Sequence, residues 1–168
     1  MRDNIIIRPA GRHELGEVRS FIRELAVYER LAEQAVATEA DLAVALFGPR
    51  PFAEVVFACL EAEPVGFALF FRNFSTLRGK PGLYLEDLFV RPQARGLGIG
   101  RLLLAWLART AVARGCARLD WAVLDWNAPA IAFYRKLGAV AHEEWTTFEA
   151  HGCGAGAPGA LVRFIGPR

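Results

Sequence analysis

Residues 83–101 read Leu-Tyr-Leu-Glu-Asp-Leu-Phe-Val-Arg-Pro-Gln-Ala-Arg-Gly-Leu-Gly-Ile-Gly-Arg. The first eight are apolar or aromatic except for Glu86 and Asp87, so we expect a buried strand that ends before Pro92. Residues 101–114 are rich in Leu, Trp and Ala and lack Gly and Pro, which predicts a helix. The three glycines between them allow a turn whose backbone N–H groups converge on an anion, at the positive end of the helix dipole. The stretch therefore predicts a strand, a phosphate-binding turn and a helix.

The spacing of these glycines excludes two common phosphate loops. A Walker loop needs Lys and then Ser or Thr after its last glycine, whereas Arg101 and Leu102 stand here. The dinucleotide fingerprint needs G-x-G-x-x-G, but the glycines are at positions 96, 98 and 100. The pattern Arg-x-x-Gly-x-Gly, which begins at Arg95, resembles the pyrophosphate loop of the GNAT superfamily of acetyl-CoA-dependent N-acetyltransferases. The alternative is a glycine-rich turn that binds no ligand.

The composition sets limits on the kind of protein. With 168 residues, 54% hydrophobic and 23% charged, the chain fits a single domain, residues 1–168, with a substantial core. A net charge of +2 is too small to predict a nucleic-acid surface. Three cysteines without C-x-x-C spacing predict neither a disulfide framework nor a metal site. No apolar run approaches the ~18 residues of a membrane span, and no signal peptide precedes the first strand. We therefore expect a cytoplasmic protein without metal, nucleic-acid or membrane partners.

The periodicity of apolar residues predicts an α/β fold with a mixed central sheet of about seven strands and helices on both faces. The expected order is β-α-α-β-β-β-α-β-α-β-β. Strands are expected at residues 4–8, 54–62, 65–73, 83–90, 118–124, 139–148 and 161–165, and helices at 12–29, 38–46, 101–114 and 129–137. Glu63-Pro64 is expected to form a hairpin turn, Thr38 to be an N-cap, and Gly138 to be a C-cap.

A second motif follows the fifth expected strand. Residues 127–138, which run from Asn127 through Phe133-Tyr134 to Gly138, are similar to the Asn-x-x-Ala/Ser-x-x-Phe-Tyr-x-x-x-Gly motif of GNAT enzymes. From the residues alone, Tyr134 lies near the edge of an apolar helix face, where it is either a core residue or a catalytic one. The resemblance is closest to the diamine (spermidine/spermine) acetyltransferases and their relatives that act on thialysine-like amines. It includes Ile7–Ala10, Tyr28-Glu29, Glu33-Gln34, Thr38-Glu39 and Tyr84–Val90.

One loop departs from the polyamine enzymes. Their loop before the central strand carries acidic and Trp residues, whereas residues 73–82 contain Arg78 and Lys80 and no carboxylate. This difference leaves a smaller amine or an amino-acid side chain open as the acceptor.

The resemblance implies a homodimer that uses acetyl-CoA as cosubstrate, with Leu88–Val90 pairing with the pantetheine arm as an extra strand. The cofactor-binding residues that it implies are Leu88, Phe89, Val90, Arg95, Gly96, Leu97, Gly98, Ile99, Gly100, Arg101, Asn127 and Ala130. Those implied to face the acceptor amine are Tyr28, Glu29, Glu86, Asp87, Asp120, Trp121 and Glu144. Tyr134 and Glu86 are implied to be catalytic.

Amine chemistry suggests how these residues would act. An alkylammonium has a pKa near ~10.4, so a carboxylate must attract the cation and help to remove its proton. Our candidate is Glu86, acting directly or through one water. Because neighbouring side chains on a strand point to opposite faces, we expect a lesser role for Asp87. Tyr134 would donate a hydrogen bond or a proton to the leaving thiolate. The expected function is N-acetylation of a small cationic amine; the alternatives are acetylation of a protein lysine or N-terminus, and a non-catalytic acyl-CoA sensor.

Overall fold

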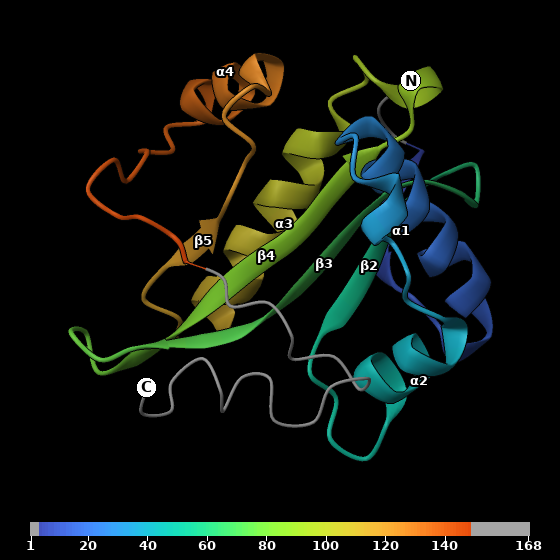
Figure 1. Ribbon diagram of the computed structural model, residues 1–168, viewed down its shortest axis with the longest axis horizontal. Coiled ribbons are helices and arrows are strands. Elements are labelled where there is room, and N and C mark those ends of the chain that lie inside the picture. The colour runs from blue at the N-terminus through green and yellow to red at the C-terminus, as the bar shows by residue number, and fades with distance from the viewer. Residues whose placement is uncertain (1–3, 149–168) are drawn as a thin grey trace, which may run out of the picture. The chain divides into compact units, whose positions relative to one another are not determined.

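A five-stranded sheet forms the centre of the fold in the computed structural model, which describes residues 4–148 (Figure 1). The strands lie in the order β1-β2-β3-β4-β5; all neighbours are antiparallel except β4 and β5, which are parallel. Their bounds are β1 Ile5–Pro9, β2 Glu54–Leu60, β3 Glu63–Ser75, β4 Lys80–Val90 and β5 Leu119–Trp121. The predicted α/β class and mixed sheet are confirmed, but the predicted number of about seven strands is wrong for the described residues.

The two missing strands have different explanations. Residues 139–148 are described and form no strand. A strand is stable where one of its faces is buried against a core, and here Val140, Trp145 and Phe148 are exposed. The predicted strand at 161–165 lies outside the described residues.

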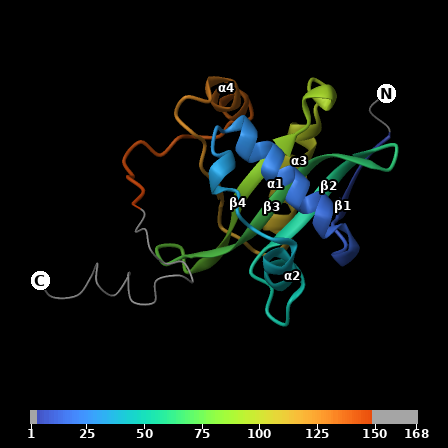
Figure 2. The same cartoon turned by 45° about the vertical axis from the view of Figure 1, so that its right-hand side comes forward.

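The helices lie on both faces of the sheet, as predicted. Turning the view by 45° shows α1 in front of the strands and α3 behind them (Figure 2). The helices are α1 Leu15–Tyr28, α2 Glu39–Phe47, α3 Ile99–Ala113 and α4 Ala128–Lys136, with short 3₁₀ turns at Arg12–Glu14, Ala32–Gln34 and Pro92–Ala94. One compact unit ends at Ile131, within α4, and the described part of the second unit is residues 132–148.

Aromatic side chains fill both faces of the sheet. On the α1 face, the Phe21 ring lies 5.1 Å from the Phe67 ring and 5.6 Å from the Phe57 ring, and all three are fully buried. On the α3 face, Phe70 meets Trp106 edge-on at 5.9 Å. Burying one such side chain stabilises the fold by about 1.5–3 kcal/mol, so these contacts hold α1 and α3 firmly against the strands.

The turn between β2 and β3 differs from the one expected. We predicted Glu63-Pro64, but Glu61 and Ala62 take positive φ values of 50° and 74°, and Pro64 lies within β3. A two-residue hairpin turn in which both central residues have positive φ cannot use proline, whose ring fixes φ near −65°. The predicted caps are confirmed: Thr38 accepts from Asp41 N at 3.2 Å, and Gly138 ends α4 at φ +87°.

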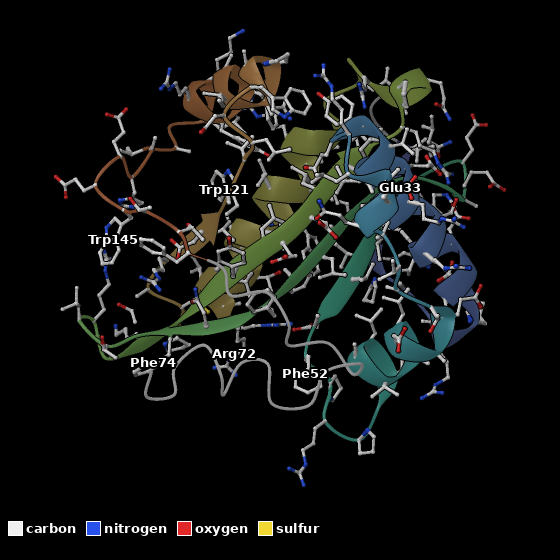
Figure 3. The ribbon with its side chains drawn as sticks, in the orientation of Figure 1. Glu33, Phe52, Arg72, Phe74, Trp121 and Trp145 are labelled. Atoms are coloured by element: carbon white, nitrogen blue, oxygen red, sulfur yellow. The ribbon has the colours of Figure 1, made fainter. Side chains whose placement is uncertain are left out.

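Two irregularities of the sheet shape the region after residue 85. Leu69 pairs with Asp87 while Phe70 pairs with Leu85, so Glu86 is the extra residue of a β-bulge. β5 pairs only with Leu83–Leu85, so within the described residues β4 has no strand neighbour on that side beyond Leu85. β3 extends past β2 at its other end, where Arg72 and Phe74 pair only with β4 (Figure 3).

No helix within residues 4–148 has the length and apolar character needed to cross a membrane. The same residues contain no group of three or more His, Cys, Asp or Glu side chains that could hold a metal ion. Cys59 and Cys116 are free thiols.

Candidate active site

The glycine turn leads directly into α3. Gly96 and Gly98 both have φ +81°, a conformation that glycine adopts readily. Gly98 is the N-cap of α3, yet no side chain caps this helix start and its first turn contains no acidic residue. A methyl group built on either glycine would meet no atom within 4 Å, so the space above the turn is open. The N–H groups of the first turn are thus available to an anion, as a pyrophosphate site requires.

The Arg95 side chain folds back from this turn toward β4. Its Nε donates to the Val90 carbonyl at 3.0 Å, and its guanidinium lies 5.0 Å from the Tyr28 ring and 5.5 Å from the Phe89 ring. The Arg95 side chain, which belongs to the glycine turn, therefore contacts both the end of α1 and the end of β4.

Asn127 joins the end of α1 to the start of α4. It is buried, and its Oδ1 accepts a hydrogen bond from the Tyr28 hydroxyl at 3.2 Å and from Ala130 N at 3.3 Å. The second bond makes Asn127 the N-cap of α4, which begins at Ala128. Tyr28, Asn127 and Ala130, all predicted site residues, are thus brought together.

Three carboxylates, Glu29, Glu86 and Asp87, gather where α1 ends over β4. Burial, with the nearby charges of Glu86 and Glu29, raises the pKa of Asp87 from 3.8 to about 7. Burial also raises the pKa of Glu29. Such a cluster attracts a cation and contains one carboxyl group that titrates near neutral pH.

A β-bulge lies at the pair that we expected to point to opposite faces of the sheet. Because a bulge interrupts the alternation of a strand, the expected division of roles between Glu86 and Asp87 stays a prediction. Asp87 is paired with Leu69, which packs against the core on the α1 face, and Asp87 is electrostatically coupled to Glu29 at the end of α1. Asp87 is thus partly buried beneath the end of α1, whereas the Glu86 side chain is exposed.

The predicted residues on β5 are Asp120 and Trp121. Asp120 forms an ion pair with Arg118 Nε at 2.7 Å. Asp120 is paired across the parallel strands with Tyr84, whose pKa is raised by burial and then by the charges of Glu86 and Asp120. Trp121 lies on β5 opposite Leu85 (Figure 3).

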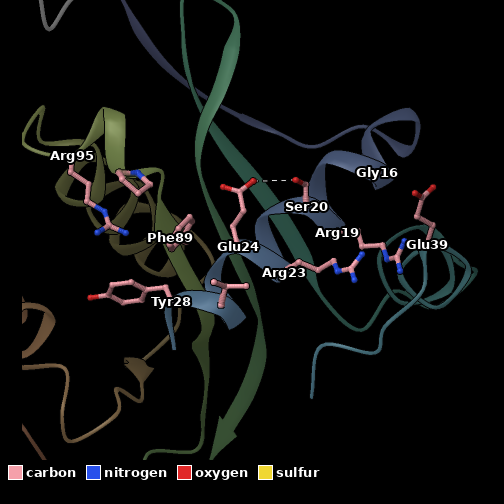
Figure 4. Close-up of a pocket in the computed structure, with 11 residues that line it drawn as sticks. Gly16, Arg19, Ser20, Arg23, Glu24, Tyr28, Glu39, Phe89 and Arg95 are labelled. Carbon is pink, nitrogen blue, oxygen red and sulfur yellow. Dashed lines mark hydrogen bonds between the residues drawn. The ribbon is translucent and has the colours of Figure 1, made fainter. Parts of the chain in front are cut away.

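A pocket of about 680 Å³ runs along α1 (Figure 4). Tyr28, Phe89 and Arg95 line one end, and Arg19, Arg23 and Glu39 lie toward the other. Between them, Glu24 accepts from the Ser20 hydroxyl at 3.1 Å. The pocket thus extends the site from the glycine turn along the helix.

Two predicted residues belong to the second unit and are described within it alone. Tyr134 is half-buried on α4, and its ring lies 5.4 Å from the Phe133 ring. Glu144 is exposed. Their roles remain predictions.

Two residues near the site were not among the sequence candidates. Trp126 lies 6.1 Å from the Tyr28 ring, and the Arg30 guanidinium lies 4.9 Å from the Trp126 ring. The neighbouring motif residue Asn127 is a signal that could have pointed to Trp126. Nothing in the sequence marks Arg30, because its position depends on a backbone conformation at the end of α1.

Comparison with known proteins agrees with this geometry. Residues 21–139 match the acetyltransferase (GNAT) family. The thialysine N-epsilon-acetyltransferase of Bos taurus is 36% identical over 159 residues, covering 88% of this chain and 93% of that protein. The L-ornithine N5-acetyltransferase of Arabidopsis thaliana is 33% identical over 184 residues, covering 83% of this chain and 81% of that protein.

Solved structures share the fold. An integron cassette protein from the mobile metagenome of V. cholerae superposes with a TM-score of 0.77 at 29% identity, covering 96% of this chain and 97% of that one. An aminoglycoside acetyltransferase from a soil metagenome, in complex with sisomicin, superposes with a TM-score of 0.75 at 20% identity, covering 88% of this chain and 96% of that one. This likeness shows the fold alone. The predicted resemblance is confirmed, and the protein is an acetyltransferase: the chain belongs to the acetyltransferase (GNAT) family.

Proposed function

We propose that this acetyltransferase transfers an acetyl group from acetyl-CoA to the primary amine of a small cationic acceptor, by direct attack within a ternary complex. The observation that carries the proposal is the cluster of Glu29, Glu86 and Asp87, in which Asp87 has a pKa of about 7. A group of like charges that includes a partly buried carboxylate is costly to fold and is expected where a cation binds.

The residues of the glycine turn fit acetyl-CoA, the cosubstrate of this family. The uncapped start of α3 presents N–H groups without a competing carboxylate, and Gly96 and Gly98 leave room for a diphosphate. The open edge of β4 at Leu88–Val90 offers backbone groups to the pantetheine arm. Acetyl-CoA supplies an activated acyl thioester to the amine.

The carboxylate cluster then manages the proton of the amine. Transfer from an ammonium of pKa ~10.4 to an ordinary aspartate of pKa ~3.9 costs about 9 kcal/mol. Transfer to Asp87, with a pKa of about 7, costs about 5 kcal/mol. We first assigned this role to Glu86; the acidity favours Asp87 as the proton acceptor, with Glu86 contributing its negative charge. Tyr134 remains our candidate for donating a proton to the leaving thiolate.

The relatives support an acceptor with a side-chain amine. Two of them are named for thialysine and ornithine, which are amino acids with a primary amine at the end of the side chain. Asp120 is already paired with Arg118, so one carboxylate fewer is available to bind the several amines of a long polyamine. We also propose a cytoplasmic homodimer, on the family resemblance.

The experiment is release of free thiol from acetyl-CoA over a panel of amines. The panel comprises ornithine, lysine, thialysine, putrescine, spermidine and a lysine peptide, and calorimetry measures acetyl-CoA binding in parallel. Turnover of the small amines supports the proposal. Turnover of the peptide alone would indicate a protein acetyltransferase, and binding without any turnover would indicate a sensor; either result contradicts the proposal.

A further inference from the structure

Arg30 ends α1 in a conformation that its side chain disfavours. Its φ is +63°, and the last turn is closed by hydrogen bonds from Arg30 N to Val27 O at 3.1 Å and from Leu31 N to Ala26 O at 2.8 Å. Helices that end in this way commonly have glycine at the position of Arg30, because a Cβ atom is strained there. The backbone alone therefore favours glycine, and a residue kept against such strain is a candidate for a side-chain function.

The Arg30 side chain places a positive charge beside the proposed amine site. Its guanidinium lies 4.9 Å from the centre of the Trp126 ring, which is 45% exposed and packs 6.1 Å from Tyr28. Arg30 also directly follows Glu29, a member of the carboxylate cluster. The end of α1 thus places the carboxylate of Glu29, which can attract an amine, next to the guanidinium of Arg30, which lies over the Trp126 ring.

A cation fixed at this place favours or disfavours an acceptor according to the charge that the acceptor carries at the end opposite its reacting amine. The amine and the carboxylate carbon of an extended ornithine are about 6 Å apart, from bond lengths near 1.5 Å. Arg30 directly follows Glu29 in the chain, so an acceptor whose amine lies at the carboxylate cluster has its other end in the region of Arg30. The carboxylate of an amino acid is attracted to Arg30 and offsets the repulsion of the neighbouring α-ammonium, whereas the second ammonium of a diamine is repelled with nothing to offset it.

We propose that Arg30 is a specificity-determining residue that selects acceptors with a carboxylate remote from the reacting amine, such as basic amino acids, over diamines and polyamines. The inference rests on the proposed function, since it concerns the acceptor end of the same site.

The test compares ornithine with putrescine, which is ornithine without its carboxylate. Arg30→Gly removes the cation and relieves the backbone, Arg30→Lys keeps the charge, and Arg109→Gln removes an exposed charge on α3, outside the site, as the control. We expect Arg30→Gly to lower kcat/KM for ornithine about tenfold through KM, and to leave or raise kcat/KM for putrescine. Arg30→Lys and Arg109→Gln should keep the wild-type preference for ornithine.

Two results would overturn the inference while the proposed function stands. One is an equal change for both amines in Arg30→Gly, which would make Arg30 a support for Trp126. The other is a wild-type preference for putrescine. Arg30→Asn, which also tolerates positive φ, should reproduce the glycine result and guards against a folding artefact. If the wild type turns over neither amine, the proposed function fails and this inference fails with it.

Discussion

The acidity of Asp87 predicts that replacing it stabilises the protein at alkaline pH. Its pKa is raised from 3.8 to about 7 by burial and by the charges of Glu86 and Glu29. The folded state therefore keeps a proton that the unfolded chain has already released. Because the folded pKa is the higher one, this group stabilises the fold at low pH, and that contribution is lost as the pH rises through 7.

The size of the effect follows from the proton linkage. At this residue the folded state binds about one proton more than the unfolded state at pH 5.5, about half a proton more at pH 7 and almost none more at pH 8.5, and one proton is worth about 1.4 kcal/mol for each pH unit. The wild type should thus lose about 2 kcal/mol of unfolding free energy between pH 5.5 and 8.5 because of Asp87. Asp87→Asn, which has no charge to bury, should not lose it.

Urea unfolding at pH 5.5 and 8.5 measures this difference. Asp41→Asn is the matched control, because hydrogen bonds from Thr38 lower the pKa of Asp41 and its stabilising effect is lost only on acidification. Asp41→Asn should therefore change the unfolding free energy by the same amount at both pH values. If Asp87→Asn and the wild type show the same pH dependence between pH 5.5 and 8.5, the reasoning about Asp87 is wrong.

Three further variants test other parts of the structure. Gly98→Ala should lose about 1 kcal/mol of stability from strain at φ +81° and should also weaken acetyl-CoA binding; Gly79→Ala, at φ +59°, should lose stability without affecting binding, as calorimetry would show. Arg91→Ala should cost about 1 kcal/mol in urea unfolding, because it removes the partly exposed ion pair with Glu24 at 2.7 Å and the contact of the Arg91 guanidinium with the Phe21 ring at 4.2 Å; an unchanged unfolding free energy would contradict this. Thr38→Ala should cost about 1 kcal/mol by removing the N-cap of α2, with unchanged turnover; an altered kcat would show that α2 contributes to the site.

Much of the fold follows from local patterns in the sequence. The helical period of α1, the Thr38 cap and the Gly138 stop all depend on residues close together in the chain, and each was predicted correctly. The hairpin turn was missed because Glu61 and Ala62 carry no turn signature. The strand at 139–148 was wrongly predicted because the residues of a segment cannot say whether a neighbouring strand exists to pair with it.

The site was predictable in its chain positions but not in its chemistry. The glycine turn and the Glu86-Asp87 pair were recognisable as motifs. The raised pKa of Asp87 depends on its burial and on the charge of Glu29, which is distant in sequence. Likewise, the contact of Arg30 with Trp126 arises from a positive φ at the end of α1, which no residue pattern indicates.

The central claim, that a carboxylate cluster centred on Asp87 accepts the proton of the amine, is tested most directly by the pH dependence of kcat/KM for the best acceptor. We predict that the wild-type rate rises with pH through an ionisation near 7, and that Asp87→Asn loses this ionisation together with most of its activity, by about 10²-fold or more. Full activity of Asp87→Asn with an unchanged pH profile would contradict the account.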